Sequence, residues 1–266
     1  KMVGRSPAFK SLISNLDKVT KSNGRVMLKG PAGSGKEIAA RYIYLNSSRL
    51  GAPFISISCA SIAPERMEEV LFGTEENGVI KQGLLEQADS GVLFFDEVAD
   101  MPIGTQSKIL RVLTDQKFKR VNGNHDVKVN VRIICTTSKN IINEIKIGKF
   151  HEDLFYRLNV FQIEIEPLSK RVEDIPLLIE YFSSKISNSY NLKKLNIRGD
   201  NSYLINHSWP GNVRELRNLI ERIAILANNN PDKISTIIKE SIKQEQDDIY
   251  SENNFSVPLK EARENF

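Results

Sequence analysis

Residues 25–37, "RVMLKGPAGSGKE", decide the fold of this 266-residue chain. A short apolar run leads into a glycine-rich turn, and apolar side chains then recur at helical spacing as far as Ile43. Glycines in such a turn let backbone N–H groups face a phosphate, and Lys36 reaches toward it from the start of the helix. A chance glycine turn is the alternative, and the strand–turn–helix setting argues against it. The stretch therefore predicts a phosphate-binding loop.

This loop supplies most of the candidate ligand contacts. Glu37 departs from the usual pattern, because a Ser or Thr that touches magnesium normally occupies its position. The predicted contacts with a nucleotide are Gly30, Gly33, Ser34, Gly35, Lys36 and Glu37.

A second signal lies at residues 91–97, "GVLFFDE", where a buried-type apolar run ends in two carboxylates. Ligands of an open α/β sheet bind beyond the carboxyl ends of its strands. Asp96 is therefore a candidate magnesium ligand, and Glu97 a catalytic carboxylate that orients or deprotonates a water. A strand that ends in Asp-Glu is weak evidence alone. Together with Lys36 it favours a nucleoside-triphosphate site.

Five apolar runs predict the strands of one sheet. They alternate with helical patterns, which is typical of a parallel sheet covered by helices on both faces. After Pro167 only helical patterns remain. We expect an α/β nucleotide-binding domain over residues 1–168, a small helical domain over 169–245 and a polar linker over 246–266. The five runs are "RVMLKG", "APFISISCA", "GVLFFDE", "VNVRIICTT" and "LNVFQIEIEPL".

Composition and charge set broader limits. The chain is 40% hydrophobic and 26% charged with a net charge of +4, which is typical of a soluble globular protein and not of a general nucleic-acid binder. Cys59 and Cys135 fall in apolar runs, which favours a reduced, cytoplasmic setting over a disulfide framework. No apolar run approaches the length of a membrane span, so no membrane partner is expected. His125, His151 and His207 have no metal-ligand spacing.

Two arginines are weaker candidates. Arg157 lies on a predicted helix just before the fifth strand, and without further context it is an ordinary surface arginine. Arg214 lies in the first turn of a helix that begins within "WPGNVREL", where its charge opposes the helix dipole. An anionic partner for Arg214 would explain that placement.

Several motifs together resemble one family. "GPAGSGKE", "LFGTEE", "GLLEQADSGVLFFDEVADMP", "EDLFYRLNV", "RVEDIP" and "WPGNVREL" follow the order of the central AAA+ domain of NtrC-type bacterial transcription regulators, from about Val3 to Leu226. The resemblance implies an AAA+ P-loop NTPase fold with a helical lid, bound ATP or ADP, and magnesium. It also implies a DNA-binding domain beyond the linker and a receiver domain addressed by a sensor histidine kinase, both outside this chain.

The same resemblance assigns roles to single residues. Arg214 corresponds to the sensor II arginine. Arg157 corresponds to the arginine finger that completes a neighbour's site in a dimer or ring. The adenine would lie near Val3 and Gly4. Family members commonly carry Glu after the loop lysine, so Glu37 is compatible with nucleotide binding.

Residues 71–88, "LFGTEENGVIKQGLLEQA", depart from the family pattern. Activators of sigma-54 polymerase carry a Gly-Ala-Phe-Thr-Gly-Ala loop after "LFG". That motif is absent here, as in the NtrX-like branch, which the chain resembles most. We expect the segment from Thr74 to Gly83 to be too short to project far. Val79 and Ile80 are then expected to pack on the domain.

Three further positions differ from the family. Ser58 stands where an Asn usually gates the catalytic Glu, Ser138 where the first sensor usually has Asn, and His151 where a second interface arginine is usual. These departures lead us to expect secure binding of ATP, with hydrolysis that is weak or dependent on assembly.

The expected function is an ATP-binding, ATP-hydrolysing regulatory module of an NtrX-like response regulator. It would control assembly or DNA binding, with RNA polymerase as a candidate partner and sigma-54 not expected as one. Two alternatives stay open, an ATP-driven sigma-54 activator motor and a AAA+ chaperone-type remodeller. The absent loop counts against the first, and "RVEDIP" and "WPGNVREL" count against the second.

Overall fold

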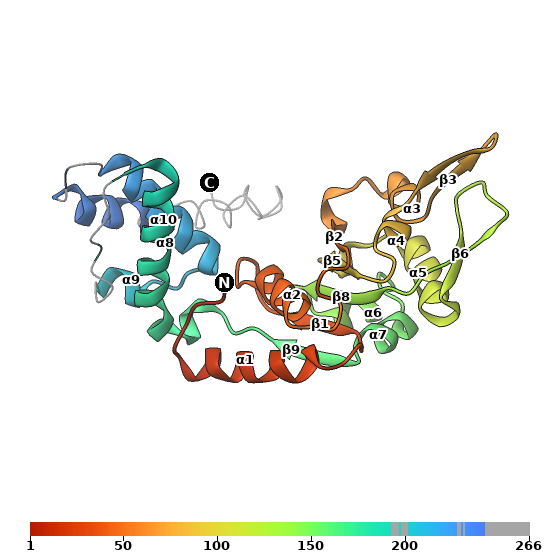
Figure 1. Ribbon diagram of the computed structural model, residues 1–266. Helices are drawn as coiled ribbons and strands as arrows, with labels where there is room; N and C mark the ends of the chain where they lie inside the picture. The colour runs from red at the N-terminus through yellow and green to blue at the C-terminus, as the bar shows by residue number, and fades with distance from the viewer. Residues whose placement is uncertain (193–196, 198–201, 228–229, 231, 243–266) are drawn as a thin grey trace, which may run out of the picture. The chain divides into compact units, whose positions relative to one another are not determined.

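The computed structural model describes residues 1–192, 197, 202–227, 230 and 232–242 (Figure 1). Two compact units can be separated by their internal contacts. The first contains Lys1–Met2 and Pro7–Pro167, and the second contains Val3–Ser6 and the residues from Leu168 onward. The expected linker over 246–266 lies outside the described residues.

The first unit is built on a parallel five-stranded sheet in the order β2-β5-β8-β1-β9. All five strands expected from the sequence are confirmed. β2, β5 and β8 are neighbours in both the chain and the sheet, whereas β1, the first strand in the chain, lies between β8 and β9. The strands are β1 (Val26–Lys29), β2 (Phe54–Ser58), β5 (Val92–Asp96), β8 (Arg132–Thr137) and β9 (Phe161–Glu164).

Helices cover both faces of this sheet because strand side chains alternate between the faces. Along β1, Val26 and Leu28 belong to one buried cluster, which includes apolar residues of α1 and α2. Met27 belongs to the other, beneath α3, α4, α5 and α7. The helices are α1 (Pro7–Thr20), α2 (Lys36–Leu45), α3 (Pro64–Phe72), α4 (Leu84–Gln87), α5 (Ile103–Asp115), α6 (Ile141–Lys146) and α7 (Glu152–Leu158).

Two hairpins complete the first unit. One pairs β3 (Gly73–Glu76) with β4 (Val79–Gln82), and the other pairs β6 (Lys117–Lys119) with β7 (Asp126–Lys128). The hairpin expected around Asn122-Gly123 is the second of these. Figure 1 shows the β3 hairpin extending away from the body of the first unit.

The β3–β4 hairpin corrects two expectations. Asn77 and Gly78 both have positive φ, at 50° and 79°, which is typical of the tightest two-residue hairpin turn. Because the turn takes only these two residues, the rest of the short segment forms the two strands of a projecting arm. The side chains of Val79 and Ile80 are 71% and 52% exposed, so the prediction that they pack on the domain is wrong.

The second unit is helical. Its buried residues form one core, which includes Trp209 and Leu216. The sequence patterns "RVEDIPLLIEYFSSKI", "GNVRELRNLIERIAILA" and "DKISTIIKESIK" predicted three of its helices, but not α9, which is too short to show a periodic pattern. The helices are α8 (Ile175–Tyr190), α9 (Ser202–Asn206), α10 (Asn212–Leu226) and a helical stretch at 233–242. Among the described residues, no helix combines the length and apolarity needed to cross a membrane.

Candidate nucleotide-binding site

The glycine-rich loop joins the carboxyl end of β1 to the first residue of α2. Gly33 and Gly35 have φ values of 74° and 108°, a region that favours glycine. Gly30 is required for space, since a Cβ there would lie 2.7 Å from the main-chain oxygen of Ile165. The backbone is therefore held in a conformation that other residues would strain.

Lys36 crosses the loop from the start of α2. Its side chain is only 6% exposed, and its Nζ donates to the main-chain oxygens of Gly30 and Pro31 at 2.8 and 3.3 Å. The same Nζ lies 3.0 Å from Glu97 Oε1. The loop lysine and the carboxylate after β5 thus meet at the carboxyl edge of the sheet, as the sequence predicted.

The ends of β5 and β8 hold the two carboxylates in place. Thr136 Oγ1 donates to Asp96 Oδ1 at 2.6 Å and accepts from the Glu97 N–H at 2.9 Å. Ser138 donates to Glu97 Oε2 from its main-chain N–H at 2.8 Å and from Oγ at 2.9 Å. Sequence reasoning missed Thr136, although its place at the end of the apolar run "VNVRIICTT" was a usable signal.

Opposing effects set the acidity of Glu97. Partial burial of the carboxyl would raise its pKa, but the hydrogen bond from the Ser138 N–H and the pairing with Lys36 outweigh this effect. The net result is a lowered pKa, so Glu97 is held as a carboxylate. A carboxylate accepts hydrogen bonds only, as a group that orients or deprotonates a water must.

The donor set near the loop suits magnesium held jointly with phosphates. In the described part of the chain, no group of three or more His, Cys, Asp or Glu could hold a metal alone. Magnesium in nucleotide sites commonly uses one or two carboxylates plus phosphate oxygens and water. Asp96 fits that role. Glu37 instead pairs with Arg41 at 3.0 Å, and both side chains are more than half exposed.

Arg157 lies at the opposite edge of the sheet from the loop. Its main-chain oxygen accepts a 2.6 Å hydrogen bond from Arg25, the residue before β1, whereas the loop follows β1. The four residues of β1 span roughly 13 Å at the usual strand rise. The side chain of Arg157 is exposed in the last turn of α7. The structure therefore does not bring Arg157 to the Lys36 site of its own chain.

Three predicted site residues belong to the second unit. Val3 packs against that unit's core, and Gly4 is partly exposed beside it in sequence. The Arg5 N–H, next along the chain, donates to buried Asp174 Oδ1 at 2.7 Å. Arg214 is exposed in the first turn of α10.

Two family models match this chain. One, described as the sigma-54 interaction domain, matches residues 2–164, and the other, described as a AAA+ ATPase lid domain, matches residues 169–253. The chain belongs to the sigma-54 interaction domain family. The AAA+ fold implied by the sequence motifs, a parallel five-stranded sheet followed by a helical lid, is confirmed.

The relatives of this sigma-54 interaction domain include NtrX regulators. The nitrogen assimilation regulatory protein NtrX of Azorhizobium caulinodans is 42% identical over all of this chain and 60% of its own length. NtrX of Brucella abortus, solved with ADP, is 44% identical with a TM-score of 0.87 and covers all of this chain and 61% of its own. The structure of the same protein with ATP has a TM-score of 0.85 at the same sequence identity. The chain thus spans about 60% of the length of these relatives.

Proposed function

We propose that this chain is the nucleotide-binding central domain of an NtrX-like response regulator. The observation that carries the proposal is the meeting of Lys36 with Glu97 beside the glycine loop, with 3.0 Å between Nζ and Oε1. Similarity over the full chain to an NtrX solved with ADP and with ATP supports the same ligands here. Magnesium would be held by Asp96 together with phosphate oxygens.

The hydrolysis we propose uses residues on two edges of the sheet. Glu97 orients a water and takes its proton as the water oxygen attacks the γ-phosphorus, and the bond to the bridging oxygen of ADP breaks. Arg157, at the other edge, acts on the nucleotide of a neighbouring copy, where it stabilises charge that develops in the transition state. Arg214, Val3 and Gly4 are proposed as further nucleotide contacts, the roles that the family resemblance gives them.

The proposed regulatory role does not include driving sigma-54 polymerase. The β3–β4 hairpin stands where activators carry their aromatic loop, and residues 74–83 contain no Phe, Tyr or Trp. We propose that nucleotide state controls self-assembly in a dimer or ring, and so presents DNA-binding domains of the full-length protein. Signals would come from a sensor histidine kinase through a receiver domain. The buried, unpaired thiols of Cys59 and Cys135 suit a reducing cytoplasm.

One measurement tests the shared site directly. The ATPase rate per protomer is expected to rise with protein concentration, because each site needs an arginine from a neighbour. A rate that is independent of concentration across the range in which the protein assembles would refute the shared site. ATP-dependent transcripts from a sigma-54 promoter with the unmodified full-length protein would favour the activator motor instead.

A further inference from the structure

Arg25 binds both ends of the connection between α7, which carries Arg157, and β9. Its Nη1 donates to the main-chain oxygen of Arg157 at 2.6 Å, in the last turn of α7. Its own main-chain oxygen accepts from the N–H of Phe161, the first residue of β9, at 3.1 Å. One residue in front of β1 therefore fixes the last turn of α7, 132 residues further along the chain, and the start of β9 just after it.

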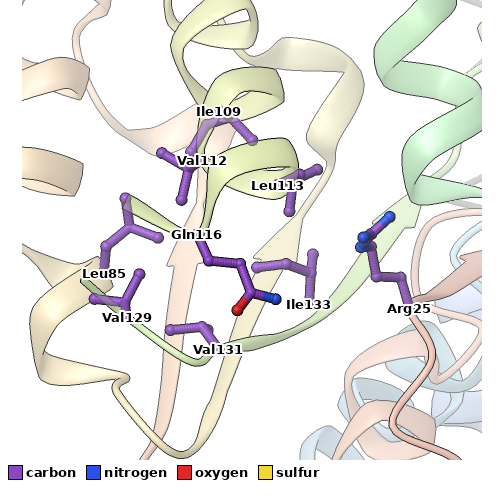
Figure 2. Close-up of a pocket in the computed structure, with 9 residues that line it drawn as sticks. All are labelled: Arg25, Leu85, Ile109, Val112, Leu113, Gln116, Val129, Val131 and Ile133. Carbon is purple, nitrogen blue, oxygen red and sulfur yellow. The ribbon is translucent and has the colours of Figure 1, made fainter. Parts of the chain in front are cut away.

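Arg25 also borders a small apolar cavity of about 40 Å³. Figure 2 shows Arg25 at one side of this cavity, next to Ile133, with α5 residues such as Leu113 on the other walls. Partial burial lowers the pKa of Arg25, and the nearby positive charge of Arg157 lowers it further. The firm geometric link between the two residues remains the hydrogen bond from Arg25 Nη1 to the Arg157 main-chain oxygen.

Capping of a helix carbonyl is the plain alternative, because arginines often bind the last carbonyls of a helix. Arg49 has a comparable structural role at the same edge of the sheet, donating to the main-chain oxygens of Gly91 and Asn130, which lie in loops before β5 and β8, at 2.8 and 2.9 Å. Arg25 differs in its acceptor. The carbonyl that it holds belongs to the residue proposed to act on a neighbour's nucleotide.

We propose that Arg25 is a positioning residue for Arg157, holding the backbone from which the Arg157 guanidinium reaches the terminal phosphate of a nucleotide bound by a neighbouring copy. This inference rests on the proposed function, in particular on Arg157 acting between chains. Arg25 acts by fixing the backbone from which Arg157 extends.

The test uses the full-length protein with four single variants: Arg25→Met, Arg25→Lys, Arg157→Ala and, as the matched control, Arg49→Met. We expect Arg25→Met to lower kcat roughly tenfold to a hundredfold, because misplacing a reacting group by about 1 Å costs that much. KM is expected to change less than about twofold, because the residues proposed to bind the nucleotide in the ground state lie at the other edge of the sheet. Arg25→Lys is expected to have a kcat between those of Arg25→Met and the parent. Arg49→Met is expected to keep the parental kcat.

Mixing experiments separate positioning from general damage. An Arg25→Met chain has an intact Lys36, and a Lys36→Ala chain has an intact Arg25 and Arg157. A mixture of the two is expected to regain activity, because the second chain supplies the pair of arginines to the first. A mixture that regains none would overturn the inference and leave Arg25 as a structural residue.

The outcome for Arg157→Ala distinguishes this inference from the proposed function. Full activity of Arg25→Met beside an inactive Arg157→Ala overturns only the role of Arg25. Full activity of Arg157→Ala overturns the shared site and the inference with it. If the unmodified protein hydrolyses no ATP, the test is instead its self-assembly in the presence of ADP and aluminium fluoride. Each of the two variants, Arg25→Met and Arg157→Ala, is then expected to raise the protein concentration at which half of the chains are assembled. An unchanged concentration for Arg25→Met overturns the inference.

Discussion

Lys36 and Glu97 form an ion pair across the carboxyl edge of the sheet, with 3.0 Å between Nζ and Oε1. Both side chains are largely buried, at 6% and 19% exposure, so the attraction is weakly screened by solvent. A phosphate in the loop would compete with Glu97 for the Lys36 ammonium. We therefore propose that nucleotide binding is coupled to the release of Glu97 toward a water.

Lys36→Ala is expected to abolish the rise in melting temperature that ATP and ADP cause. The reason is that a ligand stabilises a protein only to the extent that it binds the folded state. Differential scanning fluorimetry with and without nucleotide measures the shift. Lys10→Ala, a change to an exposed lysine of α1, is the control and should keep the full shift. An unchanged shift in Lys36→Ala would remove Lys36 from the binding site.

Glu97→Ala is expected to keep the nucleotide-dependent shift and to lose hydrolysis by a factor of about 10²–10⁴, the usual contribution of a general base. Ser138→Ala should lower the rate less, because the Ser138 main-chain N–H still holds Glu97 Oε2. Phosphate release measured under saturating ATP provides both rates. Parental activity in Glu97→Ala would show that the base lies elsewhere.

The ion pair also predicts how stability depends on pH. The folded-state pKa of Glu97 lies below its unfolded value, so its contribution is complete above about pH 4.3 and is lost as the pH falls through the folded-state pKa. Glu97→Gln should therefore lose stability less steeply than the parent when acidified below about pH 4.3. Melting temperatures measured from pH 6 downward on the same buffer series test this. Glu65→Gln, on exposed α3 surface, controls for the loss of one charge.

The projecting hairpin is expected to tolerate charge at its exposed side chains. Val79→Asp and Ile80→Asp should each change the free energy of unfolding by less than about 0.5 kcal/mol, as surface substitutions usually do. Leu71→Ala, at a fully buried position in α3, should cost about 2–5 kcal/mol and is the matched contrast. Urea titrations measure both. A large loss in Val79→Asp would show that the Val79 side chain packs on the protein after all.

Asp174 is expected to be the polar anchor of the second unit. Its carboxylate is fully buried and accepts from the Arg5 N–H, and from the Ser6 N–H and Oγ at 2.7 and 3.0 Å. Asp174→Ala leaves these buried donors without their acceptor, at a cost of about 1–3 kcal/mol for each group affected. Asp174→Asn keeps one acceptor oxygen and should cost less. Chemical denaturation of the two variants gives the comparison, and equal stability of Asp174→Ala and the parent would exclude the anchor.

Local patterns were enough to predict the parts of the site that lie on one strand, turn or helix. The loop with Lys36, the two carboxylates at the end of β5 and the main helices of the second unit all follow from apolar periodicity and glycine placement. Each of these signals spans fewer than about twenty residues, which is the range over which a repeat of apolar side chains can be recognised.

Only the tertiary structure decided which of these parts meet. Thr136 and Ser138 bind Asp96 and Glu97 from 39 to 41 residues away, and Arg25 binds Arg157 from 132 residues away. Such pairs depend on the order of the strands in the sheet, β2-β5-β8-β1-β9, which no local periodicity records. The exposed hairpin was missed for a related reason. Whether Val79 is buried depends on what the folded chain places beside it, and the sequence determines its apolar character but not its neighbours.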